Sequence, residues 1–225
     1  MSAIKNPGRF AGVLYVVTSI FGFFAMGYVP HKLIVHGDAA ATANNIAASE
    51  TLLRLGIASQ LIGIAGFIFV ALALYELFKG VNQRQAALMV ILIVVSIPIA
   101  FLNELNSIAA LILVRGADFL SVFEKPQREA LAMLFLNLHG RGLVFAELFW
   151  GLWLLPLARL VYMSRFLPRF LGVWLALAGV AWVILCFTGI LLPQYADKAN
   201  AYFQPAILGE IAFMLWLVIK GAKPA

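Results

Sequence analysis

Four side chains able to do acid–base or binding chemistry lie within one apolar stretch of the sequence. The stretch covers residues 136–156 and carries Asn137, His139, Arg141 and Glu147. It is long and apolar enough to cross a membrane, yet a helix facing lipid would not tolerate such groups. Ionisable side chains inside a bilayer are costly and usually face a bundle interior or a wet cavity. These residues are therefore the first candidates for a functional site.

A second polar set lies in the segment 86–114. Pro98 is expected to kink this segment, because proline removes one backbone hydrogen bond and clashes with the carbonyl four residues earlier. At 100° per residue, Ser96, Asn103 and Ser107 fall within about 40° of one another on a helix. They form a polar stripe that we expect to point into the bundle. The residues flanking this stripe are Glu104 and Asn106.

Counting along each helix places the polar groups at two depths. A helix rises 1.5 Å per residue, so the distance from the basic residues at its inner end estimates depth. An outer level lies about 27 Å from these anchors and a middle level about 15 to 18 Å. The outer level holds Gln60, Asn103, Glu104, Asn106, Asn137, His139, Arg141 and Thr188. The middle level holds Glu147 and Glu210.

Two pairings follow from these depths. Glu104 and Arg141 share the outer level, so they are predicted to form a salt bridge; in the alternative, Arg141 builds an anion or headgroup site. Glu147 and Glu210 are predicted to face one another in the middle level. With no basic residue assigned to that depth, two close carboxyl groups would share a proton at neutral pH.

Composition identifies the class of protein. Of the 225 residues, 64% are hydrophobic and 12% are charged, whereas soluble domains are about a quarter charged. Each apolar segment approaches or exceeds the roughly 20 residues that span a bilayer. The sequence therefore predicts an all-α polytopic membrane protein, a bundle of six transmembrane helices in a single domain, 1–225. The segments are 10–29, 54–78, 86–114, 131–162, 170–192 and 205–219.

Basic residues are divided unevenly between the two sets of loops. With the amino terminus inside, nine basic residues, including Lys5 and Lys223, lie on the inner side against Glu76 alone. The outer side carries six basic and six acidic residues. Inner loops carry an excess of Lys and Arg, so we expect a bacterial inner-membrane protein with both termini cytoplasmic. The net charge of +6 then meets anionic headgroups. This predicts membrane lipid, not nucleic acid, as a partner.

The outer loop after the first segment is interpreted as a lid, at about residues 30–53. Pro30 is expected to end the first helix, and Asp38 to cap a short helix that follows. His31 and His36 are five positions apart, about 140° around a helix, so they could not share a metal there. A haem site would need a second histidine inside the membrane, and Cys186 is the only cysteine. No cofactor and no metal are predicted.

Several sequence runs resemble a bacterial integral-membrane family known as domain of unknown function 4386. The runs are FWGLWLLPL at 149–157, SRFLP at 164–168, LG at 171–172, RFAG at 9–12 and TANNI at 42–46. The resemblance covers essentially the whole chain. It implies a six-helix bacterial membrane protein, and it brings no activity with it.

Three classes of function fit the sequence. The first is a protein that binds, or carries, a small molecule, lipid or ion in a polar intramembrane cavity. The second is an intramembrane lipid-modifying enzyme, with Glu104 or His139 as general base and Arg141 holding a phosphate or carboxylate. The third is an accessory or structural membrane protein whose polar groups only fix packing.

Overall fold

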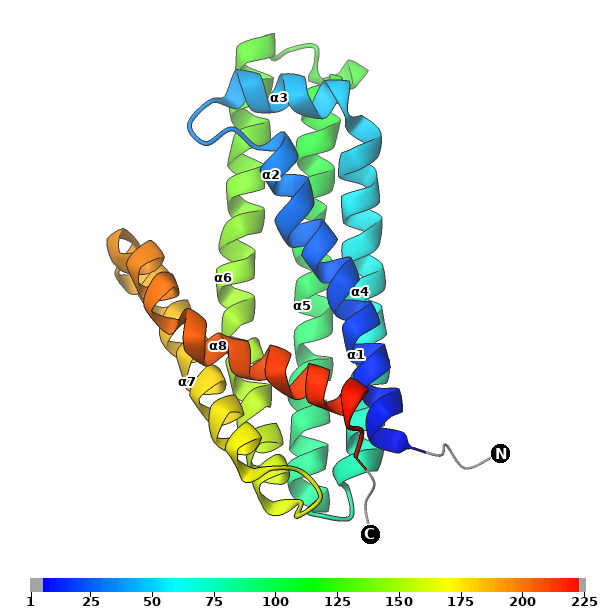
Figure 1. Cartoon of the computed structure of the whole chain (residues 1–225). Helices are drawn as coiled ribbons and strands as arrows, with labels where there is room; N and C mark the ends of the chain where they lie inside the picture. Colours follow the sequence, from blue (N-terminus) through cyan, green and yellow to red (C-terminus); the bar gives the residue numbers. More distant parts are fainter. Residues whose placement is uncertain (1–5, 223–225) are drawn as a thin grey trace. The chain divides into compact units, whose positions relative to one another are not determined.

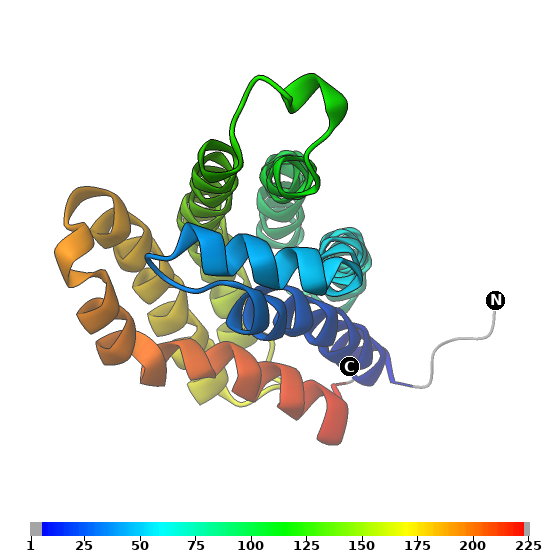
Figure 2. The same cartoon turned by 90° about the horizontal axis from the view of Figure 1, so that it is seen from above.

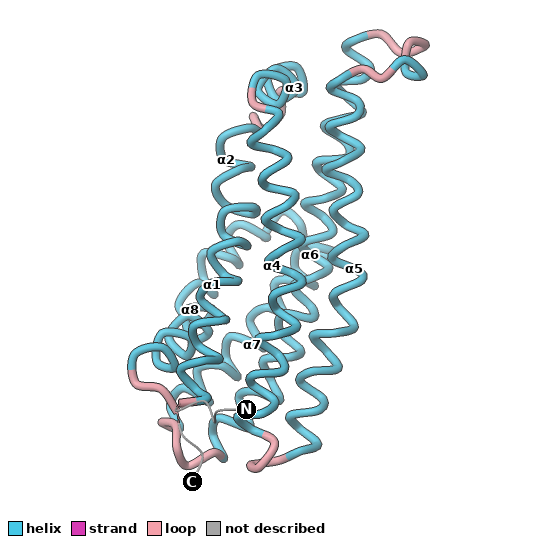
Figure 3. Tube along the Cα trace, turned by 90° about the vertical axis from the view of Figure 1, so that its right-hand side faces the viewer, coloured by secondary structure: helices cyan, strands magenta, loops and turns pink. Residues whose placement is uncertain are grey.

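The computed structural model describes residues 6–222, and every long element in it is helical (Figure 3). Six helical stretches within this range are long and apolar enough to cross a membrane. The all-α polytopic fold predicted from composition is thus confirmed, and the protein is a multi-span membrane protein. Lys5 and Lys223, which were counted for orientation, lie outside the described residues. The helices are α1 (Pro7–Phe23), α2 (Val29–Leu33), α3 (Ala39–Ala48), α4 (Glu50–Phe78), α5 (Gln83–Arg115), α6 (Lys125–Met163), α7 (Arg169–Leu191) and α8 (Ala196–Ile219).

The first span does not end at Pro30, so that prediction is wrong. A π-helical segment (Phe24–Tyr28) joins α1 to α2, and the helical path continues to Leu33. The N–H of Val29 bonds to the carbonyl of Phe24, five residues back. This wider turn places Pro30 in the first turn of α2. Proline is tolerated there because its missing N–H is not needed.

Three other prolines, Pro98, Pro156 and Pro205, also lie inside helices without ending them. Pro98 lies within α5, where the hydroxyl of Ser96 donates to the carbonyl of Ile93 at 2.7 Å. Pro205 lies within α8, which begins at Ala196 and not at the proline as predicted. The residues of α8 that precede Pro205 can be helical, because only Pro and Gly strongly oppose the helical conformation.

The chain divides into two compact units. One unit contains three segments, namely the chain up to Val17, Ala65–Ile97 and the chain from Val144 onward. It is named the α7–α8 unit. The unit called here the α3 unit contains Thr18–Ile64 and Pro98–Leu143. Helices α1, α4, α5 and α6 each contribute one part to each unit. The prediction of a single domain stays a prediction.

In the α7–α8 unit, α1 lies directly against the end of α8. A Cβ atom added at Gly12 would lie 2.8 Å from the backbone nitrogen of Val218, closer than real contacts allow. Gly8 meets the chain just after α8 in the same way. Arg9 Nε then donates to the carbonyl of Val218 at 3.1 Å, near the carbonyl-rich end of α8. The two glycines are therefore packing positions, as their small-xxx-small spacing indicates.

In the α3 unit, the short helix α3 lies across the end of the unit (Figures 1 and 2). The Asp38 carboxylate accepts from the N–H of Ala41 at 2.8 Å, which confirms the predicted N-cap. Ile46 is 1% exposed and packs in an apolar cluster with Leu33 and Leu53. The predicted lid is thus a helix with a capped start and a buried face.

Candidate functional site

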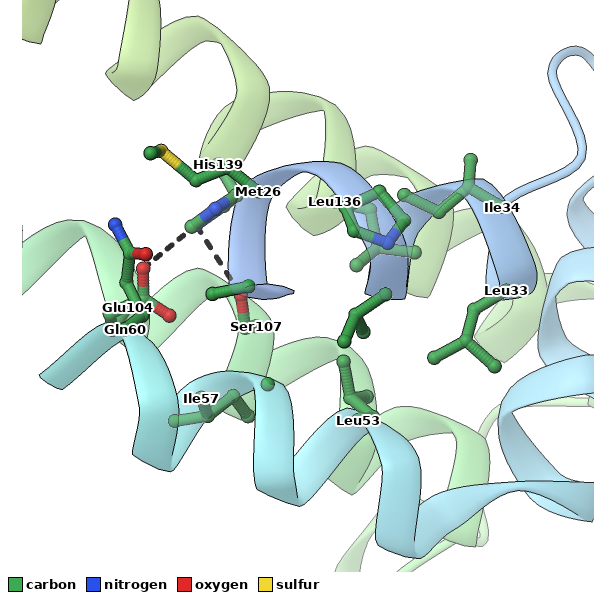
Figure 4. Close-up of a pocket in the computed structure, with 14 residues that line it drawn as sticks. Met26, Leu33, Ile34, Leu53, Ile57, Gln60, Glu104, Ser107, Leu136 and His139 are labelled. Carbon is green, nitrogen blue, oxygen red and sulfur yellow. Dashed lines mark hydrogen bonds and ion pairs between the residues drawn. The ribbon is translucent and has the colours of Figure 1, made fainter. Parts of the chain in front are cut away.

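A cavity of about 50 Å³ lies inside the α3 unit (Figure 4). A water molecule needs about 10 to 15 Å³ on this scale, so there is room for a few waters or a small ligand group. Most of the lining is apolar. Four polar side chains gather at one end, and they are Gln60, Glu104, Ser107 and His139.

Helical periodicity explains how these residues come to line one cavity. On α4, Leu53, Ile57 and Gln60 all line it, and their spacing of four and then three residues places them on one face. Glu104 and Ser107 on α5 are also three residues apart. The π-helical segment contributes to the wall as well, through Ala25 and Met26. Single π-helical turns inside helices often occur at functional sites.

His139 lies at the centre of the polar end. Its Nδ1 atom is 3.3 Å from the hydroxyl oxygen of Ser107 and 3.7 Å from Oε1 of Glu104 (Figure 4). The side-chain amide of Asn103 donates to the His139 carbonyl at 3.0 Å. Its nitrogen is also 3.4 Å from Nδ1. The imidazole is therefore held between α5 and α6 by polar contacts.

Asn103 can take this position because α6 has a glycine opposite it. A Cβ atom added at Gly142 would overlap the Asn103 amide, whereas one added at Gly140 would meet nothing within 4 Å. The side chain of Asn106 donates to the Asn103 carbonyl at 3.1 Å. Asn103 thus connects α5 to α6 beside the cavity, and Asn106 supports Asn103 within α5. The residues that line the cavity do not include either of them.

The polar end contains more acceptors than the protein satisfies. Gln60 is 8% exposed and Glu104 is 4% exposed. The amide oxygen of Gln60 has no hydrogen-bond partner among the described residues. The Gln60 and Glu104 side chains both line the polar end of the cavity (Figure 4). Leaving a buried polar group unpaired costs about 1 to 3 kcal/mol, so this end is suited to a group that donates hydrogen bonds.

Glu104 has a close contact that the sequence did not predict. Its Oε1 atom lies 3.7 Å from Nδ1 of His139, and the two groups form an ion pair only when the imidazole is protonated. Two residues along a helix are about 200° apart around its axis, so His139 and Arg141 lie on different faces of α6. Arg141 is exposed, as is Asn137 one turn away. The salt bridge between Glu104 and Arg141 stays a prediction.

In the α7–α8 unit, Glu210 has a phenol as its partner. The hydroxyl of Tyr15 donates to Oε1 of Glu210. Tyr15 is 2% exposed, and its ring lies edge-on to Phe67 with centroids 5.4 Å apart. Phe67 in turn lies edge-on to Trp153 at 5.4 Å. This carboxyl group is therefore held within packed aromatic rings.

Glu147 has a different neighbour again. Its carboxyl group lies near the thiol of Cys186 on α7. One turn beyond it, Gly151 of α6 meets Gly179 of α7 so closely that a side chain on either would collide. Glu210 likewise has a neighbour on α7, Trp182, in addition to Tyr15 of α1. The facing of Glu147 and Glu210 therefore stays a prediction.

Comparison with known proteins identifies the family. Residues 10–221 match the family described as "Domain of unknown function (DUF4386)". The chain belongs to this family. One relative, an uncharacterized protein from Archaeoglobus fulgidus, is 37% identical over 79 residues, which is 34% of this chain. The match spans 44% of the relative, and no solved structure matches the chain. The family predicted from the sequence runs is confirmed.

Sequence reasoning missed one polar residue of this DUF4386 chain that has a defined role. Tyr15 was read only as part of an apolar span. A signal existed, because a buried tyrosine hydroxyl usually finds a hydrogen-bond partner. Tyr15 lies well inside a membrane span, so its hydroxyl required a polar group on a neighbouring helix. Ser107 was noted in the polar stripe but not named as a site residue.

Proposed function

We propose that this DUF4386 protein binds a small, largely apolar molecule or lipid-derived compound in the cavity of the α3 unit. The observation that carries the proposal is the unpartnered amide oxygen of Gln60, buried beside the Glu104 carboxylate. A ligand bearing an amine or a hydroxyl group would donate to both acceptors. An anionic ligand would be repelled by an ionised Glu104.

The shape and lining of the cavity support an amphiphilic ligand. Apolar residues such as Leu33, Leu53 and Leu136 line the part away from the polar groups. Met26 adds a flexible, polarizable wall, which can adapt to ligands of different shape. Ligand sites are commonly apolar with a few converging polar groups. The volume of about 50 Å³ suits a small head group and the first carbons attached to it.

The arrangement favours binding over acyl-transfer catalysis. Ser107 and Glu104 both approach the same ring nitrogen of His139, Nδ1. A serine–histidine–carboxylate relay uses the two nitrogens separately, one toward the serine and one toward the carboxylate. His139 therefore serves better as a hydrogen-bonding wall than as the base of a nucleophilic serine.

The same proposal includes an orientation in the membrane. Six candidate spans within the described residues would put both termini on one side, and the excess of basic residues there favours the cytoplasmic side. The α3 helix would then face the outside of the inner membrane, so the cavity would be loaded from that side or from the lipid. A periplasm-dependent reporter fused after Ala225 should be inactive.

Binding is tested by thermal unfolding in detergent with matched probes. Hexylamine should raise the melting temperature of the wild-type protein, and hexanoate should not. Gln60→Leu and Glu104→Gln should each abolish the amine effect. The same changes at exposed positions, Gln83→Leu and Glu76→Gln, should leave it intact. An equal effect of hexanoate, or an unchanged amine effect in both cavity variants, would refute the proposed ligand class.

A further inference from the structure

A second cavity, of about 110 Å³, lies elsewhere in the α3 unit. Its polar lining comes from Asn44 of α3 and from the first turns of α6, with Lys125, Arg128 and Glu129. Alanines of α3 and the last turn of α5 supply apolar walls. It shares no lining residue with the first cavity. Its ligand chemistry can therefore be considered separately.

This cavity lies where two candidate membrane spans end. The span formed by α5 ends at Arg115, and the span formed by α6 begins at Lys125. Leu113 and Val114 from the end of one span and Lys125 from the start of the next all line the cavity. Residues at such span ends lie at the polar boundary of the bilayer.

Arg128 is held in place but is not fully satisfied. Its guanidinium packs on Gly116, where an added Cβ atom would overlap Nη1. Gly116 has a φ of +69°, a conformation in which glycine is favoured. Within the part of the chain that the structure describes, the Nε atom of Arg128 is buried without a hydrogen-bond partner. A fixed arginine with an unused donor is suited to an anion.

The local charge balance leaves Arg128 as the uncompensated cation of the cavity. The carboxylate of Glu129 is 3.7 Å from the Lys125 ammonium. The Lys125 side chain is 70% exposed, whereas that of Glu129 is 12% exposed. At this distance and with an exposed lysine, the pair is weak, and the lysine can turn toward a ligand. Two cations against one carboxylate leave a net positive lining.

We propose that this cavity binds a phosphate group, with Arg128 as the principal contact and Lys125 and Asn44 as further donors. Guanidinium groups bind phosphate oxygens by paired, charge-assisted hydrogen bonds. The group could belong to the headgroup of an anionic phospholipid or to free phosphate. At headgroup depth, the membrane itself supplies anionic lipid at high local concentration. The apolar wall from α5 would contact the ester region of such a lipid.

Native mass spectrometry of the detergent-purified full-length protein tests this proposal. Phosphatidylglycerol or phosphatidylcholine is added at matched concentrations, and the fraction of protein that retains one lipid is measured. Arg128→Gln should reduce phosphatidylglycerol retention about tenfold, the scale of one charge-assisted contact. Arg115→Gln is the matched control, because it removes an exposed arginine at the same membrane boundary. The control should retain phosphatidylglycerol as the wild type does.

A second variant protects the test against a folding defect. Gly116→Ala keeps every charge but displaces the guanidinium, and it should also weaken phosphatidylglycerol retention. Inorganic phosphate that competes with the lipid identifies free phosphate as a ligand, whereas failure to compete identifies the lipid headgroup. Equal losses in Arg128→Gln and Arg115→Gln, or unchanged phosphatidylglycerol retention in Arg128→Gln, would overturn the proposal.

Discussion

Glu104 and Glu210, two carboxyl groups inside the spans, have opposite surroundings. Glu104 lines a cavity together with an amide that has an unpartnered oxygen, and Nδ1 of His139 is 3.7 Å away. Glu210 accepts directly from Tyr15, whose ring packs against Phe67. Glu104 therefore has space and unpartnered hydrogen-bond acceptors around it, whereas Glu210 has a hydrogen-bond donor and packed aromatic rings.

This difference separates a binding role from a structural one. In the bilayer, water is scarce, so each polar group must find its partner within the protein or in a ligand. The Tyr15 hydroxyl gives Glu210 a partner within the protein, which favours a clamp between α1 and α8. The acceptors around Glu104 exceed the donors, which favours a ligand. Four variants break or sharpen this comparison.

The largest effect is expected from Tyr15→Phe. Removing the hydroxyl takes away the hydrogen bond that Tyr15 donates to Glu210 inside packed rings, and should lower the free energy of unfolding by about 3 kcal/mol. Replacing both partners, as Tyr15→Phe with Glu210→Leu, should recover most of that loss. Denaturant titration in detergent measures both. Purely additive losses in the double variant would show that the two residues do not act as a pair.

Gly142→Val should have the next largest effect. The new side chain would displace the Asn103 amide and, with it, the hydrogen bond that holds His139. Overpacking of this kind costs about 1 to 3 kcal/mol, and the amine response of the melting temperature should disappear. Gly140→Val is the control, since nothing lies within 4 Å of its added Cβ atom. The same loss in both variants would point to a general intolerance of α6 to valine.

Gln60→Leu should act in the opposite direction on stability. Replacing an unpartnered buried amide by an apolar side chain should raise the free energy of unfolding by about 1 kcal/mol in ligand-free protein. Added hexylamine should no longer stabilise it. Gln83→Leu, at an exposed position, should change neither quantity. A destabilised Gln60→Leu variant would mean that the amide is satisfied in the membrane.

Asp38→Ala should have the smallest effect. It removes the side-chain cap of α3 and should lower local stability by about 0.5 to 1 kcal/mol. Hydrogen exchange should become faster for the α3 amides, while those of α7 and α8 keep their rates. Exchange that is unchanged across Ala39–Ala48 would show that buried contacts such as Ile46 hold this helix without its cap.

Local features of this protein were determined by the sequence alone. Apolar length fixed the six spans, because a helix must cover the bilayer with about 20 residues. The Asp38 cap and the close packing at Gly8 and Gly12 were also predictable, since each depends on a short motif. The rise per residue correctly grouped Gln60 and Glu104 with His139 at one depth. The sequence signal for each of these properties lies within a single helix.

The partners of the buried polar groups were decided only by the tertiary structure. Depth is one coordinate, whereas pairing also requires the rotation of each helix about its axis and the identity of its neighbour. His139 contacts Glu104 because α6 presents that face to α5, whereas Arg141, two residues on, lies on a different face of α6. Tyr15 reaches Glu210 because α1 packs along α8 at Gly8 and Gly12. Packing of side chains from distant segments fixes these rotations, and no short stretch of sequence contains that information.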